Sequence, residues 1–182
     1  MFVQNFRFFG IFFLLCVILS SNIPSSHAQH HGHAHGHALG HVHMEVPCNH
    51  KAKELFNRGL LHQHSFGHAE AYGFFSDAVA EDPDCSMAYW GMALSALDNL
   101  FDRPASADRE RAAKALAQAP VARTPWNAWL EALHPLTEPD PINWQGSLDQ
   151  FSARMEEIAK ADPQNDEAQV FFALSLLMAA PA

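Results

Sequence analysis

The apolar residues between positions 50 and 180 recur at the three- and four-residue spacing of amphipathic helices. Gly67 separates the first two apolar stripes, and Asp82-Pro83 follows the second, as residues that break helices do. The first stripe contains Leu55, Phe56, Gly59 and Leu60, and the second contains Ala71, Phe74, Phe75, Ala78 and Val79. No run alternates between apolar and polar residues as a strand between hairpin turns does, so the pattern predicts an all-α fold.

Five further helices are predicted after this first pair. Thr124 is the expected N-cap of one of them, because Pro125 suits the first position of a helix. A proline-rich loop is expected over residues 135–142. The five helices should cover residues 86–100, 106–117, 125–133, 143–160 and 166–179.

The first helix pair fits the 34-residue tetratricopeptide pattern, in which each unit consists of two helices. Gly59 and Ala71 are small enough to let two helices approach closely, and Phe75 fills the seam between them. The Asp82-Pro83 break recurs as Asp162-Pro163, which indicates a second, similar pair separated from the first by longer loops. Residues 48–182 are therefore predicted to form a TPR-like helical-repeat solenoid.

Several strings in this region resemble the amino-terminal part of exported bacterial tetratricopeptide-repeat (TPR) proteins. The most specific string is DPDCSMAYWG at positions 82–91. The others are FNRG at 56–59, HSF at 64–66, Thr124-Pro125, and DEA at 166–168 with FFAL at 171–174. The resemblance implies an α-solenoid that binds other proteins, and it supplies no catalytic residues.

The last predicted helix is apolar on nearly every side, whereas the terminal unit of a solenoid needs a polar outer face. Its apolar residues are Val170, Phe171, Phe172, Ala173, Leu174, Leu176, Leu177 and Met178. Members of the resembled family continue well beyond the corresponding point. The solenoid is therefore expected to be incomplete at its C-terminus, or to self-associate through this helix.

The amino terminus has the pattern of a secretory signal peptide over residues 1–28. Arg7 precedes an apolar run over residues 8–19, and Ser26-His27-Ala28 supplies the small residues of a cleavage site. The run is shorter than the roughly 20 residues that a membrane-spanning helix needs. Export to the periplasm or medium is therefore predicted, with no membrane association after cleavage; the alternative is an uncleaved anchor.

Histidine outnumbers the basic residues, with 13 His against 11 Lys+Arg. Most of this excess lies in residues 29–47, where glycine and alanine separate the histidines and predict a flexible tail. Neutral imidazole is a common ligand of Zn²⁺, Cu²⁺ and Ni²⁺, so the tail is a candidate site for these metals. The candidate ligands are His30, His31, His33, His35, His37, His41 and His43. The alternative is a low-complexity spacer that binds no metal in the cell.

His64 and His68 are weaker metal candidates at the turn between the first two helices, while His62 is expected to pack in the repeat. Cys48 and Cys85 remain in the chain after signal cleavage, and in an oxidising compartment they predict one disulfide. The alternatives are two buried thiols, or a nucleophilic Cys48 assisted by the nearby His50.

The formal net charge of -9 argues against a nucleic-acid binder or a protein of anionic membranes, because the chain has no basic footprint. No Ser/His/Asp order, phosphate-binding glycine loop or zinc-protease helix is present, so no catalytic or cofactor-binding residue is predicted. The expected function is an exported scaffold for unidentified protein partners, with a metal-binding tail. The alternatives are a periplasmic metal-handling protein whose functional part is the tail, and the N-terminal portion of a larger enzyme.

Overall fold

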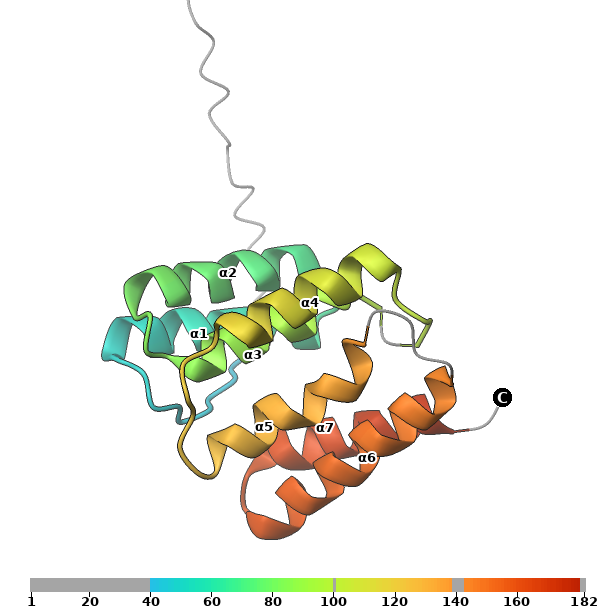
Figure 1. Cartoon of the computed structure of the whole chain (residues 1–182). Coiled ribbons are helices and arrows are strands. Elements are labelled where there is room, and N and C mark those ends of the chain that lie inside the picture. Colours follow the sequence, from blue (N-terminus) through green and yellow to red (C-terminus); the bar gives the residue numbers. More distant parts are fainter. Residues whose placement is uncertain (1–39, 100, 139–142, 181–182) are drawn as a thin grey trace, which may run out of the picture. The chain divides into compact units, whose positions relative to one another are not determined.

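The computed structural model describes residues 40–99, 101–138 and 143–180. Within these residues all regular secondary structure is helical, which confirms the predicted all-α class. A short 3-10 turn, η1 (His134–Leu136), lies between the fifth and sixth helices (Figure 1). The helices are α1 (His50–His64), α2 (His68–Glu81), α3 (Ser86–Ala96), α4 (Ser106–Gln118), α5 (Trp126–Leu133), α6 (Trp144–Ala161) and α7 (Asp166–Ala179).

The first three helices pack closely because Phe75 of α2 lies against two glycines. A Cβ atom added to Gly59 of α1 would lie 2.8 Å from Cε1 of Phe75, and one added to Gly91 of α3 would lie 2.4 Å from its Cδ1. Both distances are too short for real carbon atoms. The glycines therefore permit the close approach, which the sequence pattern predicted for Gly59 but not for Gly91.

The turn between α2 and α3 is repeated between α6 and α7. Asp82 ends α2 with backbone angles of -144° and 91°, and Asp162 ends α6 with -134° and 80°. In both turns the aspartate N–H donates to the carbonyl four residues earlier, and its own carbonyl accepts from the N–H three residues later. The recurrence of Asp-Pro in the sequence is thus matched by a recurrence of local structure.

Aromatic rings from four helices form the centre of the core. The Trp90 ring of α3 lies edge-on to Trp129 of α5 at 5.3 Å and to Phe171 of α7 at 5.2 Å between ring centroids. Phe56 of α1 lies 6.5 Å from the same indole. These contacts join the first, middle and last helices in one apolar cluster.

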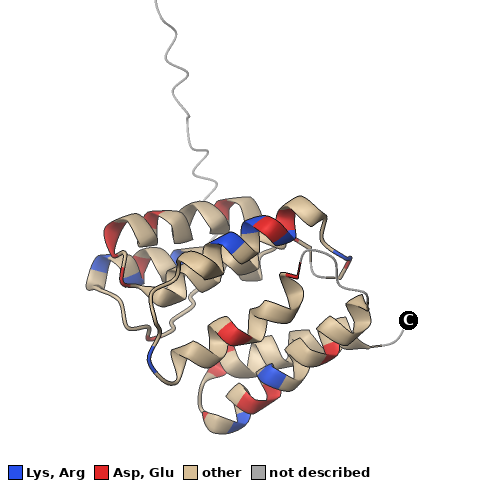
Figure 2. Ribbon diagram, viewed as in Figure 1, with Lys and Arg blue, Asp and Glu red and all other residues tan. Residues whose placement is uncertain are grey.

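Helix α3 carries no charged residue, and Lys, Arg, Asp and Glu lie on the helices around it (Figure 2). It packs against α1, α2, α4 and α5. Its eleven residues are all buried except Tyr89 and Met92, which are half-buried. Because α3 faces protein on all sides, it needs no amphipathic pattern.

Two predicted helix ends were wrong. Helix α3 ends at Ala96 instead of continuing to residue 100, because Asp98 adopts a left-handed backbone with φ of 55°. Helix α5 begins at Trp126, and no side chain caps it, so Thr124 is not an N-cap. Pro125 already has helical backbone angles, and the Trp126 N–H donates to the carbonyl of Arg123 instead.

The segment before α1 belongs to the packed body, although the sequence pattern placed it in a flexible tail ending at residue 47. Met44 and Val46 are buried with 3% and 4% exposure, and Val42 packs against the same core. The Asn57 side chain accepts a hydrogen bond from the Met44 N–H and donates one to the Met44 carbonyl. Alternate apolar residues of this extended segment therefore face the helices.

The outer side of α7 exposes large apolar residues. Val170, Leu176 and Leu177 are 47%, 51% and 66% exposed, while Phe171 and Met178 on the opposite side are buried. The described residues contain no helix long and apolar enough to cross a bilayer. The exposed residues of α7 are thus a surface feature of a short helix.

Candidate functional site

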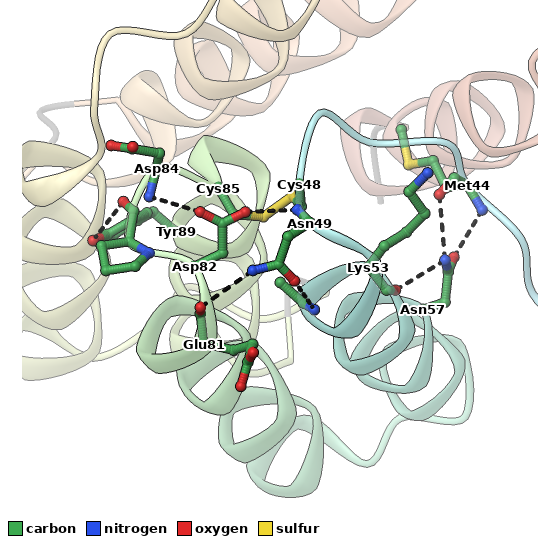
Figure 3. Close-up of a disulfide and its surroundings, with 12 residues drawn as sticks. Met44, Cys48, Asn49, Lys53, Asn57, Glu81, Asp82, Asp84, Cys85 and Tyr89 are labelled. Atoms are coloured by element: carbon green, nitrogen blue, oxygen red, sulfur yellow. Dashed lines mark hydrogen bonds between the residues drawn. A yellow bond between two sulfur atoms is a disulfide. The ribbon is translucent and has the colours of Figure 1, made fainter.

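Cys48 and Cys85 form a disulfide between the start of α1 and the start of α3, with 4.8 Å between their Cα atoms (Figure 3). This is the pair predicted from the sequence. Asn49 reinforces the junction, because its N–H donates to a carboxylate oxygen of Asp82 and its side-chain amide donates to the carbonyl of Glu81. Cys48 is therefore a structural residue in this oxidised form and has no free thiol to act as a nucleophile.

Of the seven predicted tail ligands, only His41 and His43 lie within the described residues. His30, His31, His33, His35 and His37 lie outside them. Both described histidines are exposed, and Nε2 of His43 lies 2.8 Å from a carboxylate oxygen of Glu45. Their imidazoles are accessible to solvent at the point where the tail joins the packed body.

A broad groove of about 730 Å³ follows the exposed side of α1 next to this point. His43, Glu45, His50 and Glu54 line it together with basic residues, among them Lys53. The Lys53 ammonium hydrogen-bonds to Glu45, and this contact, followed by the one from His43, holds the pKa of the Glu45 carboxyl below its usual range. Among the residues that the structure describes, no three His, Cys, Asp or Glu side chains are placed to hold a metal ion.

His64 and His68, the weaker metal candidates, line one pocket at the α1–α2 turn but have different partners. Nε2 of His64 lies 2.7 Å from a carboxylate oxygen of Glu167 on α7, and the His64 ring lies 5.4 Å from the Phe171 ring. The His68 ring is edge-on to Phe66, and its Nδ1 atom is buried without a hydrogen-bond partner. His62, expected to pack, is half-buried and stacks on Phe74.

This pocket has a volume of about 210 Å³ and collects residues from three parts of the chain: the α1–α2 turn, the segment after α3, and α7. We refer to it as the phenylalanine pocket. Its lining residues are Gln63, His64, Phe66, His68, Asp98, Asn99, Phe101, Val170, Phe171 and Leu174. It therefore combines an apolar wall with several polar groups, as small-ligand sites do.

Two lining residues of the phenylalanine pocket have unusual backbones. Phe66 has φ of 58° and Asp98 has φ of 55°, and within the described residues they are the only non-glycine residues with positive φ. Such a conformation is unfavourable for a residue with a side chain, most of all for a large one such as phenylalanine. Left-handed residues of this kind cluster at ligand sites more often than elsewhere.

Sequence reasoning identified His64 and His68 but missed Asp98, Phe101 and Glu167 as their neighbours. Asp98 was assigned to a longer helix, and Glu167 stands 103 positions after His64 in the chain. The one available signal was Glu167 itself, an acidic residue in the first turn of a strongly apolar helix. That position predicts a favourable interaction with the helix dipole and does not indicate which histidine it contacts.

The chain matches no protein-family model, no curated protein and no solved structure. Its relation to exported TPR proteins accordingly stays a prediction that rests on the strings at positions 56–59 and 82–91. The chain therefore has three candidate functional features: the phenylalanine pocket, the exposed side of α7 and the histidines that precede α1.

Proposed function

We propose that this protein is an exported, TPR-like helical-repeat scaffold that binds other proteins. The observation that carries the proposal is the recurrence of one helix–turn–helix geometry, first in α2–α3 and again in α6–α7, at Asp82 and Asp162. Repeated helix pairs that pack on their neighbours build extended surfaces for partner proteins.

The exposed side of α7 is the surface at which a partner binds in this proposal. Val170, Leu176 and Leu177 are large apolar residues exposed to solvent on a single helix. In a repeat protein such a side packs against the next helix pair, another copy of the chain or a different protein. Burial of these side chains would supply the main favourable free energy of binding.

Export is supported by the disulfide between Cys48 and Cys85, since such bonds persist in oxidising compartments. The sequence pattern of a signal peptide over residues 1–28 lies outside the described residues and stays a prediction. In this proposal the mature chain begins at Gln29.

A photo-crosslinking amino acid placed at Leu177 tests the scaffold function. Leu177 is 66% exposed on α7, and Val121 is a matched control because it is fully exposed in the segment between α4 and α5. Crosslinking in the source cells should give a protein adduct of defined mass from position 177 and none from position 121. Equal adducts from both positions, or none from position 177, would contradict the proposal. An adduct with the mass of a dimer would show that the partner is a second copy of this chain.

Transition-metal binding by the tail is the second function that we propose. It is favoured by the exposure of His41 and His43, which lie at the end of a run of seven histidines. Imidazole is a common ligand of Zn²⁺, Cu²⁺ and Ni²⁺, and the expected affinity is modest because the described residues contain no preformed group of three ligands.

Replacement of the seven tail histidines by serine tests this second function better than deletion of residues 30–43. Deletion would also remove Val42, which packs against the core. The serine variant should lose most of the Zn²⁺ binding measured by calorimetry, whereas a His134→Asn variant should keep it. Unchanged Zn²⁺ binding in the serine variant would rule out the tail as the metal site.

A further inference from the structure

Three phenylalanine rings from separate parts of the chain line the phenylalanine pocket. Phe66 follows α1, Phe101 follows α3 and Phe171 lies in α7. Phe66 and Phe101 are 69% and 55% exposed, whereas Phe171 is 2% exposed, so two rings are open to solvent and the third is buried. The faces of aromatic rings carry partial negative charge and attract cations.

The lining of the pocket includes a carboxylate but no Lys or Arg. Asp98 is a lining residue, and the lining residue His64 is hydrogen-bonded to Glu167. In the part of the chain that the structure describes, the Asp98 carboxylate has no hydrogen-bond or ion-pair partner. Asp98 therefore gives the lining one carboxylate and no ammonium or guanidinium group, which favours a cation over an anion.

The size of the pocket limits what can enter. Its volume of about 210 Å³ is smaller than the ~300–1,000 Å³ of sites for drug-sized ligands. An apolar wall with a carboxylate at its edge suits a compact cation that has alkyl groups on its surface, and it suits a strongly hydrated metal ion poorly.

We propose that the phenylalanine pocket binds a small alkylated ammonium group, of the kind found in choline. The exposed rings of Phe66 and Phe101 contact the alkyl groups, and Asp98 provides the opposite charge. The left-handed backbones of Phe66 and Asp98 fix two of these groups at the pocket. This site contains no residue of the metal-binding tail, and it shares Val170 with the exposed side of α7.

Calorimetric titration of the full chain with choline, and with 3,3-dimethylbutan-1-ol, tests the proposal. The alcohol has the shape of choline, but a carbon atom replaces the charged nitrogen. Choline should bind about ten-fold more tightly, because only the cation gains from the ring faces and from Asp98. Equal affinities would show that the pocket does not recognise the positive charge, and absence of choline binding would show that it does not bind this cation. Either result would overturn the proposal.

Asp98→Asn is the most informative variant, because asparagine tolerates the left-handed backbone that aspartate adopts here. It should weaken choline binding about five-fold and leave the alcohol unaffected. Asp77→Asn removes an equivalent charge from the exposed side of α2 and should change neither affinity. Phe101→Leu keeps an apolar side chain but removes a ring, so it should weaken choline binding more than alcohol binding. If neither Asp98→Asn nor Phe101→Leu changed choline binding, the proposed site would be wrong.

The ammonium group can belong to a free solute or to a phosphatidylcholine headgroup. Co-sedimentation with phosphatidylcholine vesicles, abolished by free choline, would identify the headgroup as the source. Binding of choline without co-sedimentation would identify the free solute. Phosphatidylglycerol vesicles are the control, and equal co-sedimentation with both lipids would exclude the headgroup.

Discussion

Gly91 and Gly73 both lie within helices, yet a methyl group should have opposite effects at the two positions. At Gly91 the added carbon would lie 2.4 Å from the Phe75 ring, which is fully buried and cannot move away freely. At Gly73 of α2 it would meet no atom within 4 Å. Overpacking of a close contact typically costs about 1–3 kcal/mol, whereas alanine in an open helical position gains roughly 0.5–1 kcal/mol over glycine.

We therefore expect Gly91→Ala to lower the free energy of unfolding by about 1–3 kcal/mol and Gly73→Ala to raise it slightly. Urea unfolding followed by far-UV circular dichroism measures both changes. The double variant Gly91→Ala/Phe75→Leu should recover part of the loss, since the smaller side chain makes room. A Gly91→Ala protein as stable as the parent would show that the three helices are not packed as tightly as described.

At the scale of secondary-structure elements, a hydrogen bond between two side chains joins the first helix to the last. His64 of α1 contacts Glu167 of α7 at 2.7 Å, and their side chains are 26% and 11% exposed. The His43–Glu45 pair has nearly the same separation, 2.8 Å, but its side chains are 72% and 68% exposed. The two pairs thus differ mainly in burial, and loss of a partner leaves a buried group unsatisfied only in the first.

His64→Ala should lower the free energy of unfolding by about 1–3 kcal/mol, because it leaves the Glu167 carboxylate without its partner. His43→Ala should change it by less than about 0.5 kcal/mol. Thermal and urea unfolding at neutral pH measure both effects, and a double-mutant cycle with Glu167→Ala isolates the interaction. Equal losses from His64→Ala and His43→Ala would contradict the structural difference between the pairs.

Local sequence signals predicted most of the helices, but features that depend on long-range contacts were not predicted. Gly67 and Asp82-Pro83 separate helices whatever surrounds them, and Asn165 caps α7 through its own side chain, so these boundaries follow from the sequence. The sequence has no glycine at the turn around Asp98, so the predicted end of α3 lay too far along the chain. The phenylalanine pocket depends on α7 packing beside the α1–α2 turn, which no local pattern of residues encodes.

The packed segment before α1 is a second feature that depends on contacts between distant parts of the chain. Low complexity and many histidines predicted a tail, but the alternation of Val42, Met44 and Val46 gives this stretch an apolar side. Three such residues are too few to predict an element, and only the surface of α1, with Asn57 placed to bond Met44, makes burial favourable.

At the scale of the whole molecule, the Cys48–Cys85 bond closes the part of the chain that contains α1 and α2. The two cysteines are 37 positions apart, and by the chain-entropy model a loop of this size stabilises a fold by on the order of 3–4 kcal/mol. The variant Cys48→Ala/Cys85→Ala should lose about this much free energy of unfolding.

Its helix content should stay the same at low temperature, because Asn49 still caps α1 and still bonds Asp82 and Glu81. Urea unfolding of the variant, compared with the parent protein with and without reductant, measures the effect. Reduction of the parent should reproduce the loss seen in the variant. An unchanged midpoint would show that the bond adds nothing to the stability of the oxidised protein.

The burial of α3 has a consequence for how the protein opens. Amide hydrogens in a helix exchange with solvent when that helix detaches, and a helix at the surface can detach without disturbing the others. Helix α3 touches four neighbours and has Trp90 in the central aromatic cluster, so it cannot leave without separating them all. Its amides should therefore exchange only when the entire body unfolds, which makes α3 the part of the molecule that reports its global stability.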